Sequence, residues 1–466
     1  MSKFSQLAKP AIVPPLHKDF APAAIVNRAF LRMVEESGEG VKLVIALERG
    51  DGSVSVFNTK CFAEGSANSD LNLPFAERVV KTLLWQRGGW KVIVGGPKSV
   101  GEHIKNVYSS TGERKFDADF MGGVYEKPFT VEVTDADKVP APSEGTMPLG
   151  GHLDGCRIGF DLGASDRKVS AVIDGEAVYT EEVNWDPRNA TDPAYHYNEI
   201  NTALKTAASH MPRVDAVGGS SAGVYINNRP RVASLFRGVP KDKFDKIASL
   251  FIDLKKEWGG IPFDVVNDGE VTALAGAMSL KDDSVLGVAM GSSEAGGYVT
   301  PAGEITSWLN EVAFIPVDYG DNAPADEWSG DLGCGALYFS QQAVFRLAKV
   351  AGIEIDEGLG LAEKLRSVQD LLNANDERAI KIWESIGVFT GYGIAHYAMF
   401  YELKHALVLG RVTSFDGGNI ILAQAKKVLE TEFPELAKKI ELHLPDEKIR
   451  RIGQAVAAAS LPVIPH

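Results

Sequence analysis

The sequence predicts a mixed α/β fold on the basis of three observations. Hydrophobic residues make up 45% of the 466-residue chain, which is enough apolar material for two or three domains. Glycine-containing turns interrupt the apolar pattern between residues 157 and 179, which indicates a β-meander. From residue 197 onward helical and strand patterns alternate, as is typical of a mixed sheet with helices packed on it.

Residues 1–137 have an α/β pattern of their own. Apolar runs at 41–47 and 53–57 flank an Arg-Gly-Asp-Gly turn, which predicts a β-hairpin. Apolar residues at helical spacing predict an amphipathic helix over 75–85. A strand over 90–97 that ends on glycines and a helix over 99–109 complete this region.

The region after residue 156 follows the meander with a longer series of elements. Its predicted helices are 197–210, 243–258, 269–278, 340–351, 359–373, 375–404 and 447–459. Its predicted strands are 214–219, 263–266, 285–290 and 406–409. A Pro- and Gly-rich stretch precedes it, and we interpret residues 138–155 as a linker.

Charge and cysteine content exclude several classes of protein. A net charge of −14 argues against nucleic-acid binding, which depends on neutralising phosphates with Lys and Arg. No uniformly apolar stretch is long enough to cross a bilayer, and the first residues lack a secretory signal, so we expect no membrane partner. The three cysteines, Cys61, Cys156 and Cys334, are widely spaced, which favours a cytoplasmic location.

Two glycine-containing turns at strand ends are candidate phosphate sites. In the first, Asp161 ends a strand, and Gly163 and Ser165 follow; a carboxylate there can hold Mg²⁺ through water. In the second, Gly291 and Ser292 begin a Gly/Ser turn whose backbone N–H groups can face phosphate. For either turn, an ordinary β-hairpin is the alternative interpretation.

A third stretch has a strand ending on Gly410 and a helix opening on Gly417 and Gly418. A helix N-terminus with glycines suits a nucleotide, whereas a tight connection between strand and helix is the alternative.

A fourth stretch, DVVNDGE, ends a strand on Asn267 and Asp268. Asp268 is placed to cap the following helix, or to accept a proton from a substrate hydroxyl during phosphoryl transfer.

The order of these stretches resembles the actin-like ATPase superfamily and, within it, the ROK family of sugar kinases and regulators. The resemblance covers roughly residues 156–460. The most specific match is IPFDVVNDGEVTALAGAM, which is similar to the family's Pro-Val-x-x-Glu-Asn-Asp-Ala-Asn-x-Ala-Ala-Leu-Gly-Glu. The other matching stretches are IGFDLGASDRK, VDAVGGSSAGVYI, VLGVAMGSSEAGGYV, LNEVAFIPV, GDLGCGALYFSQQAV, HALVLGRVTSFDGGNIIL and EKIRRIGQAVAAASL.

The resemblance implies a two-lobed actin-like, ribonuclease H-like fold with an additional N-terminal α/β region. Its implied parts are a first lobe at 156–280, a second lobe at 281–445 and, at 446–466, a helix that returns to the first lobe. It also implies ATP and Mg²⁺ as cofactors, a sugar as substrate and a homodimer.

The resemblance also implies roles for individual residues. Asp268 falls on the catalytic base, and Asn267 and Glu311 fall on sugar-contacting positions. Asp161, Gly163 and Ser165 fall on the phosphate and Mg²⁺ loop, with Asp161 contacting the metal indirectly. Gly291 and Ser292 fall on the second phosphate turn, and Gly410, Gly417 and Gly418 lie at the nucleotide end. We add Ser220, Ser221 and Asn228 as candidates for further hydroxyl contacts.

The chain departs from the family at the zinc ligands. Phe314 stands at the position of the family's ligating His, and Cys334 alone remains of its cysteines. One cysteine cannot make a tetrahedral zinc site, so we expect no structural zinc there. Ala336 stands where a Glu is expected, and Ser293 and Glu294 alter the second phosphate turn.

Residues 1–137 are outside the resemblance. They are too rich in strand patterns and too neutral for the winged helix of ROK repressors. An accessory domain is one interpretation, and a degenerate copy of an actin-like lobe is another. The sequence as a whole predicts an ATP-dependent sugar kinase, with a catalytically impaired sugar- or nucleotide-binding regulatory or scaffold protein as the alternative.

Overall fold

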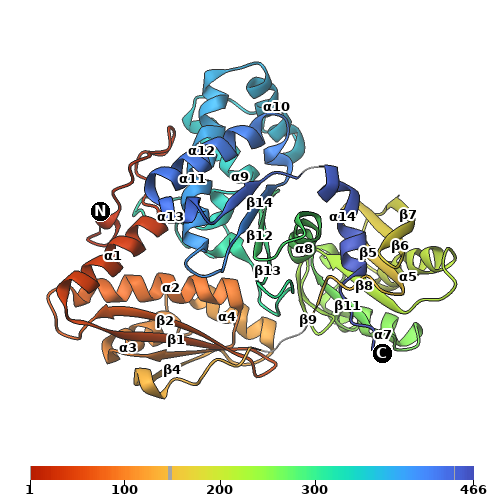
Figure 1. The fold of residues 1–466 in the computed structure, drawn as a ribbon, viewed down its shortest axis with the longest axis horizontal. Helices are drawn as coiled ribbons and strands as arrows, with labels where there is room; N and C mark the ends of the chain where they lie inside the picture. The colour runs from red at the N-terminus through yellow and green to blue at the C-terminus, as the bar shows by residue number, and fades with distance from the viewer. Residues whose placement is uncertain (1, 145–148, 446, 466) are drawn as a thin grey trace. The chain divides into compact units, whose positions relative to one another are not determined.

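A computed structural model describes residues 2–144, 149–445 and 447–465 (Figure 1). The chain divides into two compact units. Unit 1 contains Met1–Gly145, Val288–Ala295 and Trp308–Leu444. Unit 2 contains Thr146–Gly287, Gly296–Ser307 and Pro445–His466. Each unit is described separately below.

Unit 2 is built on a five-stranded mixed sheet with the order β11-β8-β5-β6-β7. Its strands are β5 (Cys156–Leu162), β6 (Asp166–Ile173), β7 (Glu176–Asn184), β8 (Ala216–Ser221) and β11 (Phe263–Asn267). β5, β6 and β7 pair antiparallel, and this confirms the predicted meander. β8 pairs in parallel with both β5 and β11, so the carboxyl ends of these three strands meet at one edge.

Helices cover both faces of this sheet. They are α5 (Pro193–Ala208), α6 (Phe244–Ala248), α7 (Leu250–Glu257), α8 (Asp268–Leu280) and α14 (Glu447–Ala459), and a small hairpin is formed by β9 (Val224–Ile226) and β10 (Arg229–Val232). A buried apolar cluster that includes Phe160, Leu204 and Phe251 joins β5 to α5 and α7. α8 and α14 share a second cluster through residues such as Leu274 and Ala458.

α14 lies close against β5 and β8 (Figure 1). A Cβ atom on Gly159 would overlap the Ala455 carbonyl, and one on Gly218 would overlap the Ala458 carbonyl. Both positions therefore require glycine for the helix to approach the sheet. The sequence prediction of a closing helix at 447–459 is confirmed, although Gly453 interrupts it with a φ of 63°.

Unit 1 begins with a four-stranded sheet of order β2-β1-β3-β4. Its strands are β1 (Gly40–Glu48), β2 (Val54–Phe62), β3 (Lys91–Gly95) and β4 (Thr130–Thr134), and its helices are α1 (Ala23–Ser37), α2 (Asn72–Arg87), α3 (Lys98–Val107) and α4 (Lys115–Tyr125). β1 and β2 form the predicted hairpin. The helix predicted over 75–85 and the strand predicted over 90–97 correspond to α2 and β3.

The strand directions in this sheet differ from those in unit 2. β1 pairs antiparallel with β3 and β3 pairs in parallel with β4, whereas β5 pairs in parallel with β8. This pairing gives no support to the hypothesis that residues 1–137 copy an actin-like lobe. The N-terminal sheet belongs to the same compact unit as residues 308–444.

The rest of unit 1 is largely helical. Its helices are α9 (Gln341–Val350), α10 (Leu361–Asn373), α11 (Glu377–Tyr397), α12 (Gly417–Glu432) and α13 (Pro434–Ala437). A further sheet has the order β13-β12-β14-β15, with β12 (Val285–Met290), β13 (Glu294–Val299), β14 (His405–Leu409) and β15 (Glu441–His443). β12 and β13 each contain residues of both units.

One predicted helix is too long. The pattern over 375–404 predicts a single helix, but α11 ends at Tyr397. The backbone then turns, and the Phe400 carbonyl accepts a hydrogen bond from Gln86 Nε2 on α2 (2.9 Å). Among the described residues, none of the helices combines the length and apolar character needed to cross a membrane.

Candidate functional site

Two carboxylates meet at the carboxyl edge of the sheet of unit 2. Asp161 lies near the end of β5, and Ser220 is its register partner on β8. Ser220 Oγ donates a hydrogen bond to Asp161 Oδ1 (2.7 Å). Asp268 is the first residue of α8, which follows β11 directly. The parallel order of β5, β8 and β11 brings these residues together, as expected for strands that end at one edge.

A side chain from α14 completes the surroundings of Asp161. With its amide nitrogen facing Asp161, Gln454 donates to both carboxylate oxygens (2.9 Å each). Its amide oxygen then accepts from Thr272 Oγ1 on α8 (2.5 Å). Gln454 therefore links the closing helix to the carboxylate and to α8.

The N-cap of α8 is Asn267, and the interpretation of Asp268 as the cap is corrected accordingly. Asn267 Oδ1 accepts from the Gly269 backbone N–H (2.7 Å), and its Nδ2 donates to the Gly223 carbonyl (2.8 Å). Asp268 also accepts from Gly269 N–H, at a longer 3.1 Å. Since Asn267 fills the capping position, the Asp268 carboxylate occupies the first turn, where the helix dipole favours negative charge.

Burial raises the pKa of both carboxyl groups. The pKa of Asp161 rises to about 6, mainly because burial disfavours the charged form and in part because Asp268 is near, although the Ser220 hydrogen bond lowers it. Burial also raises the pKa of Asp268, against the lowering effect of backbone N–H groups at the helix start. Two carboxylates that repel each other in buried surroundings form a pair that a cation would stabilise.

Close backbone packing fixes the start of α8. A Cβ atom on Gly269 would overlap the Gly296 carbonyl, and one on Gly297 would overlap the Gly269 carbonyl. The Glu270 carboxylate accepts from the Tyr298 backbone N–H (3.2 Å). These contacts lie within unit 2 and hold the first turn of the helix, and with it Asp268, against β13.

The turn after β5 is well ordered by hydrogen bonds. The Gly163 N–H donates to the Asp166 carbonyl (2.9 Å), and Trp185 Nε1 donates to the Gly163 carbonyl (2.8 Å). Ser165 Oγ donates to Asp166 Oδ2 (2.8 Å). Asp161, Asp268, Asp166 and the Ser hydroxyls offer oxygen donors, which are the ligands that Mg²⁺ prefers, so the residues present fit this metal.

Two further predicted substrate contacts also have structural partners. Both ends of the Asn228 amide bind the backbone of β11, at the Phe263 carbonyl (2.6 Å) and the Val265 N–H (2.7 Å). Ser221 Oγ lies 2.6 Å from Tyr225 Oη. Asn228 keeps one N–H and one oxygen lone pair for a ligand, as Asn267 does.

The second predicted phosphate turn lies in unit 1. The Gly291 N–H donates to the Ser293 carbonyl (3.0 Å), and the Gln341 N–H donates to the Gly291 carbonyl (2.9 Å). Ser292 and Ser293 are exposed at the tip of the turn. The turn is therefore tight, and its tip is open to solvent.

Glu294, the first residue of β13, points into unit 1 and away from solvent. It is 3% exposed, and Tyr397 Oη donates to its Oε1 (2.8 Å). Burial raises the Glu294 pKa to about 8, so the carboxyl group is mostly protonated at neutral pH. A buried, protonated carboxyl group does not repel a phosphate at the turn.

The glycines at the predicted nucleotide end also lie in unit 1. Gly410 has a φ of 100°, and a Cβ atom there would contact the backbone of Met290. A Cβ on Gly417 would contact Trp383 Nε1, which donates to the Val412 carbonyl (2.9 Å), and one on Gly418 would crowd Thr413. Packing within unit 1 therefore accounts for these glycines, with or without a nucleotide.

Glu311 lies where η6 (Val312–Phe314) begins, and its backbone is joined to α2. The Glu311 N–H donates to the Trp85 carbonyl (3.0 Å). Phe314, which the resemblance aligns with the family's ligating His, stacks on the Trp85 ring with centroids 4.1 Å apart. Trp85, from the N-terminal region, thus completes an aromatic pair at this position.

A buried ionic cluster lies beside Cys334. Asp331 forms ion pairs with Lys81 (2.9 Å), Arg78 (2.9 Å) and Arg114 (2.6 Å). These cations, from α2 and the start of α4, hold the pKa of Asp331 well below its usual range, although burial alone would raise it. Burial raises the Cys334 pKa to about 12, so its thiol stays protonated. The cluster ties the N-terminal sheet region to the 326–334 loop.

Sequence reasoning missed Gln454, the burial of Glu294 and the ionic cluster. A helix of mixed polarity carries Gln454, and nothing in its local sequence distinguishes it from a surface residue. The one visible signal of the cluster was the placement of Glu77, Arg78 and Lys81 among the apolar residues of α2.

Comparison with solved structures agrees with this fold. The chain is similar to a ROK hexokinase from Thermus thermophilus, with a TM-score of 0.50 and 16% identity over 65% of this chain and 97% of that one. It is also similar to a ROK family transcriptional regulator, a homologue of the E. coli MLC protein, with a TM-score of 0.50 and 17% identity over 70% of this chain and 82% of that one. No protein-family model matches the chain, and a search of curated proteins finds no significant match. The chain therefore has a ROK-like, actin-like ATPase fold with a divergent sequence.

Proposed function

We propose that the protein is an ATP- and Mg²⁺-dependent kinase that phosphorylates a hydroxyl group of a hexose or hexose derivative. The observation that carries the proposal is the pairing of Asp161 and Asp268 at the carboxyl edge of the sheet in unit 2, with Asp268 in the first turn of α8. A ROK-like fold, which the hexokinase of Thermus thermophilus shares, supports it. Three free, buried cysteines support a cytoplasmic location.

In this proposal Asp268 is the general base. Its raised pKa makes the carboxylate a stronger base than an ordinary Asp, and the backbone N–H groups at the N-terminus of α8 oppose that rise. It accepts the proton of the attacking sugar hydroxyl as that oxygen forms its bond to phosphorus. The cap and the Gly269 packing fix where the carboxylate lies.

Asp161 would hold Mg²⁺ through water, with Gly163 and Ser165 on the adjoining turn. The metal, when bound, neutralises charge on the phosphate oxygens. Gln454 and Ser220 hold the Asp161 carboxylate in place. Within unit 2 we propose Asn267, Ser220, Ser221 and Asn228 as sugar-contacting residues. Within unit 1 we propose Glu311 as a sugar-contacting residue and Gly291, Ser292, Gly410, Gly417 and Gly418 as nucleotide-contacting residues.

A second candidate function is sugar or nucleotide sensing without turnover. It is favoured by the loss of the family's zinc ligands, with Phe314 at the His position and Cys334 alone of the cysteines, and by the altered phosphate turn at Ser293 and Glu294. The similarity to a transcriptional regulator favours it as well. A pure binding protein has no need of a base, so the retention of Asp268 beside Asp161 favours catalysis.

The test is the variant Asp268→Ala, with Asp264→Asn as its matched control. Asp264 is a half-buried carboxylate on β11, the strand that leads into α8, and burial raises its pKa as well. Removing a general base costs about 10²–10⁴-fold in turnover. We expect Asp268→Ala to lose ATP-dependent sugar phosphorylation while calorimetry still detects sugar binding, and Asp264→Asn to keep wild-type turnover.

Unchanged turnover in Asp268→Ala would show that another group takes the proton. Binding of ATP·Mg²⁺ and a sugar by the wild-type protein, with no ADP released for any sugar, would favour the sensing function instead.

A further inference from the structure

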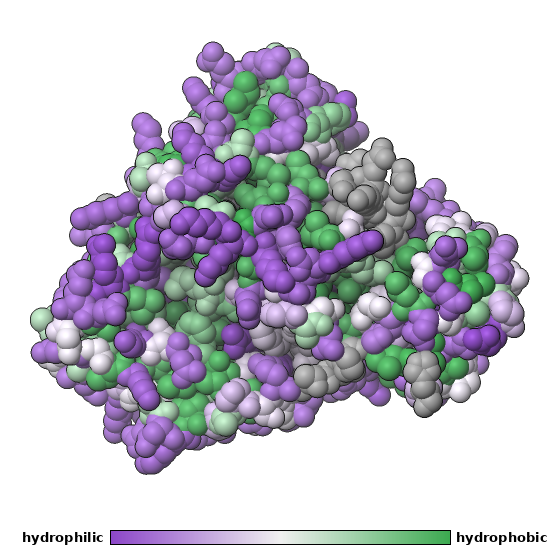
Figure 2. Space-filling view, viewed as in Figure 1, coloured by the Kyte–Doolittle hydropathy of each residue, from purple (hydrophilic) through white to green (hydrophobic). Residues whose placement is uncertain are grey.

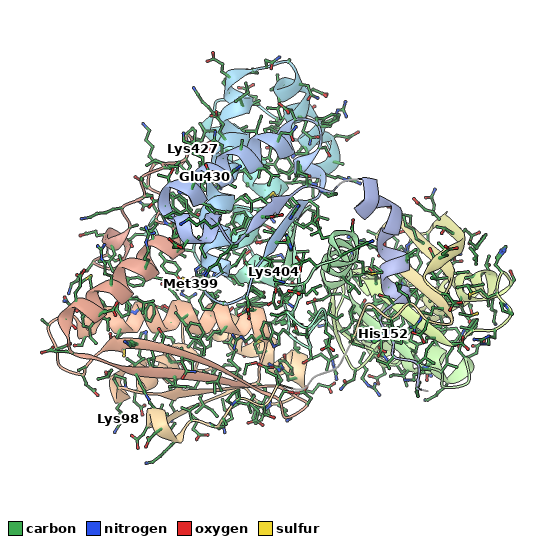
Figure 3. The ribbon with its side chains drawn as sticks, viewed as in Figure 1. Lys98, His152, Met399, Lys404, Lys427 and Glu430 are labelled. Carbon is green, nitrogen blue, oxygen red and sulfur yellow. The ribbon has the colours of Figure 1, made fainter. Side chains whose placement is uncertain are left out.

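Two histidines and a glutamate meet on the short parallel pair formed by β14 and β15. His405 is the register partner of Glu441, and Leu407 is the partner of His443. Because side chains alternate along a strand, Glu441 and His443 share one face of β15, and His405 lies on the same face of β14. Lys404, labelled in Figure 3, directly precedes this pair, and its carbonyl accepts from the Glu441 N–H (2.8 Å).

The three side chains converge on one point. His405 Nδ1 lies 3.0 Å from His443 Nε2. Glu441 Oε2 lies 4.0 Å from the former nitrogen and 3.8 Å from the latter. Ligand atoms about 2.0–2.1 Å from a tetrahedral Zn²⁺ are separated from one another by about 3.3 Å. The observed separations bracket that value, so small side-chain rotations bring all three atoms to a common ion.

We propose that His405, His443 and Glu441 bind a divalent transition-metal ion of the zinc type. Two imidazoles select against Mg²⁺ and Ca²⁺, which prefer oxygen ligands, and favour Zn²⁺ and its neighbours. These residues are separate from Phe314 and Cys334, which mark the position of the family's zinc ligands. Among the described residues, this is the only group of His, Cys, Asp and Glu with such close ligand atoms.

The burial of the three residues suits a site that is open on one side. His405 is 8% exposed, His443 is half-buried and Glu441 is exposed. Hydrophilic residues dominate the surface around α12 and α13, the helices that precede β15 in the chain (Figure 2). A metal ion can therefore enter from solvent, and water can complete three protein ligands to four.

The bound ion would fasten β15 to β14. β15 has three residues and is an edge strand of its sheet, so it has few backbone hydrogen bonds of its own. Leu444, just after it, is the last residue of unit 1, and the chain continues into unit 2 at Pro445. Metal binding would thus fix the end of unit 1 from which the chain leaves. This inference does not depend on the proposed kinase function.

The test is a calorimetric titration of Zn²⁺ into metal-stripped, full-length protein without a histidine tag. We expect one ion to bind per chain, and Co²⁺ in its place to give the visible absorption of a low-symmetry site. Loss of a side chain that only hydrogen-bonds to a metal ligand costs about 10–100-fold in metal affinity. His443→Ala removes a ligand itself, so we expect it to lower the Zn²⁺ affinity about 100-fold or more. His103→Ala, on α3, is the matched control and should bind Zn²⁺ as the wild type does.

Glu441→Gln provides a variant whose folding is not at risk, because its side chain is exposed. We expect it to weaken Zn²⁺ binding at least about tenfold and to reduce the Zn²⁺-induced rise in melting temperature. No Zn²⁺ binding by the wild type would overturn the proposal and leave the histidine pair as a hydrogen bond. Equal binding by wild type, His443→Ala and Glu441→Gln would overturn it as well.

Discussion

Asp268 in unit 2 and Asp331 in unit 1 are both carboxylates in buried surroundings, and their pKa values are shifted in opposite directions. Burial raises the pKa of Asp268, and the backbone N–H groups at the helix start only oppose that rise. Lys81, Arg78 and Arg114 surround Asp331 and hold its pKa well below the usual range. The Asp268 carboxylate can therefore bind a ligand, whereas the Asp331 carboxylate is held in ion pairs with neighbouring side chains.

The surroundings of the two acids differ accordingly. In unit 2, Asp161 and Asp268 stand together at a sheet edge. In unit 1, an aromatic stack at Phe314 and a buried ionic cluster beside Cys334 hold the loops, and α2 contributes to both. Side chains of the N-terminal region therefore fix these loops of unit 1.

The largest expected effect comes from Asp161→Asn. Because the metal stabilises transition-state charge by several kcal/mol, loss of its carboxylate should lower kcat/KM about 100-fold or more. The measurement is the rate of ADP release against Mg²⁺ concentration. Asp174→Asn, at the turn between β6 and β7, is the control and should match the wild type. An unchanged Mg²⁺ dependence in Asp161→Asn would remove this residue from the site.

Asp331→Asn tests the other side of the comparison. Removing one partner of a buried ion pair costs about 3–5 kcal/mol, because the remaining charges are left uncompensated. We expect a loss of that size in the free energy of unfolding, measured by urea titration, with the carboxylate site of unit 2 intact. Asp370→Asn, which removes an exposed partner of Arg366, should cost less than about 1 kcal/mol. Equal losses in the two variants would show that the cluster is not structural.

Glu294→Gln should change how stability depends on pH. The folded-state pKa of Glu294 is about 8, above its ordinary value of 4.5, so the folded protein binds this proton more tightly than the unfolded chain does. The resulting stabilisation of the fold is fully present below pH 4.5 and is lost as pH rises through 8. One such proton changes the free energy of unfolding by at most about 1.4 kcal/mol per pH unit. We expect Glu294→Gln to be more stable than wild type at pH 8 and similar at pH 4.5. Parallel curves for the two proteins across this range would contradict the assignment.

The smallest effect is expected from Asn267→Ala, which removes the cap of α8. Loss of an N-cap costs about 1 kcal/mol in the free energy of unfolding, which chemical denaturation can measure. The control is Asn419→Ala, an exposed change on α12 that should alter this free energy by no more than about 0.5 kcal/mol. If Asn267 also contacts the sugar, the dissociation constant of the sugar should rise in this variant as well. A variant with wild-type stability would show that Asp268 caps the helix after all.

Local patterns predicted much of the fold. The meander, the β1–β2 hairpin and the start of α8 follow from alternation, turns and capping residues close together in sequence. The meeting of Asp161 and Asp268 was also predictable, because residues at the ends of parallel strands share an edge. The end of α11 was not predictable, since a hydrogen bond from α2 to Phe400 stabilises the turn there.

The rest of the site depends on contacts between distant segments. Gln454 reaches Asp161 from the closing helix, and Tyr397 reaches Glu294 from α11. Nothing near Glu294 in sequence indicates that it is buried and protonated, and an acid in a Gly/Ser turn is most simply taken as exposed. The partners of Asp331 likewise come from α2 and α4, so its role is visible only once the chain has folded.

The most direct test of the account is an ADP-release assay of the wild-type protein with ATP·Mg²⁺ over hexoses, amino sugars and their N-acetyl forms. The account predicts ADP release that depends on one class of sugar and is lost in Asp268→Ala. Binding of ATP·Mg²⁺ and of a sugar in calorimetry, with no sugar-dependent ADP release for any member of the panel, would contradict it.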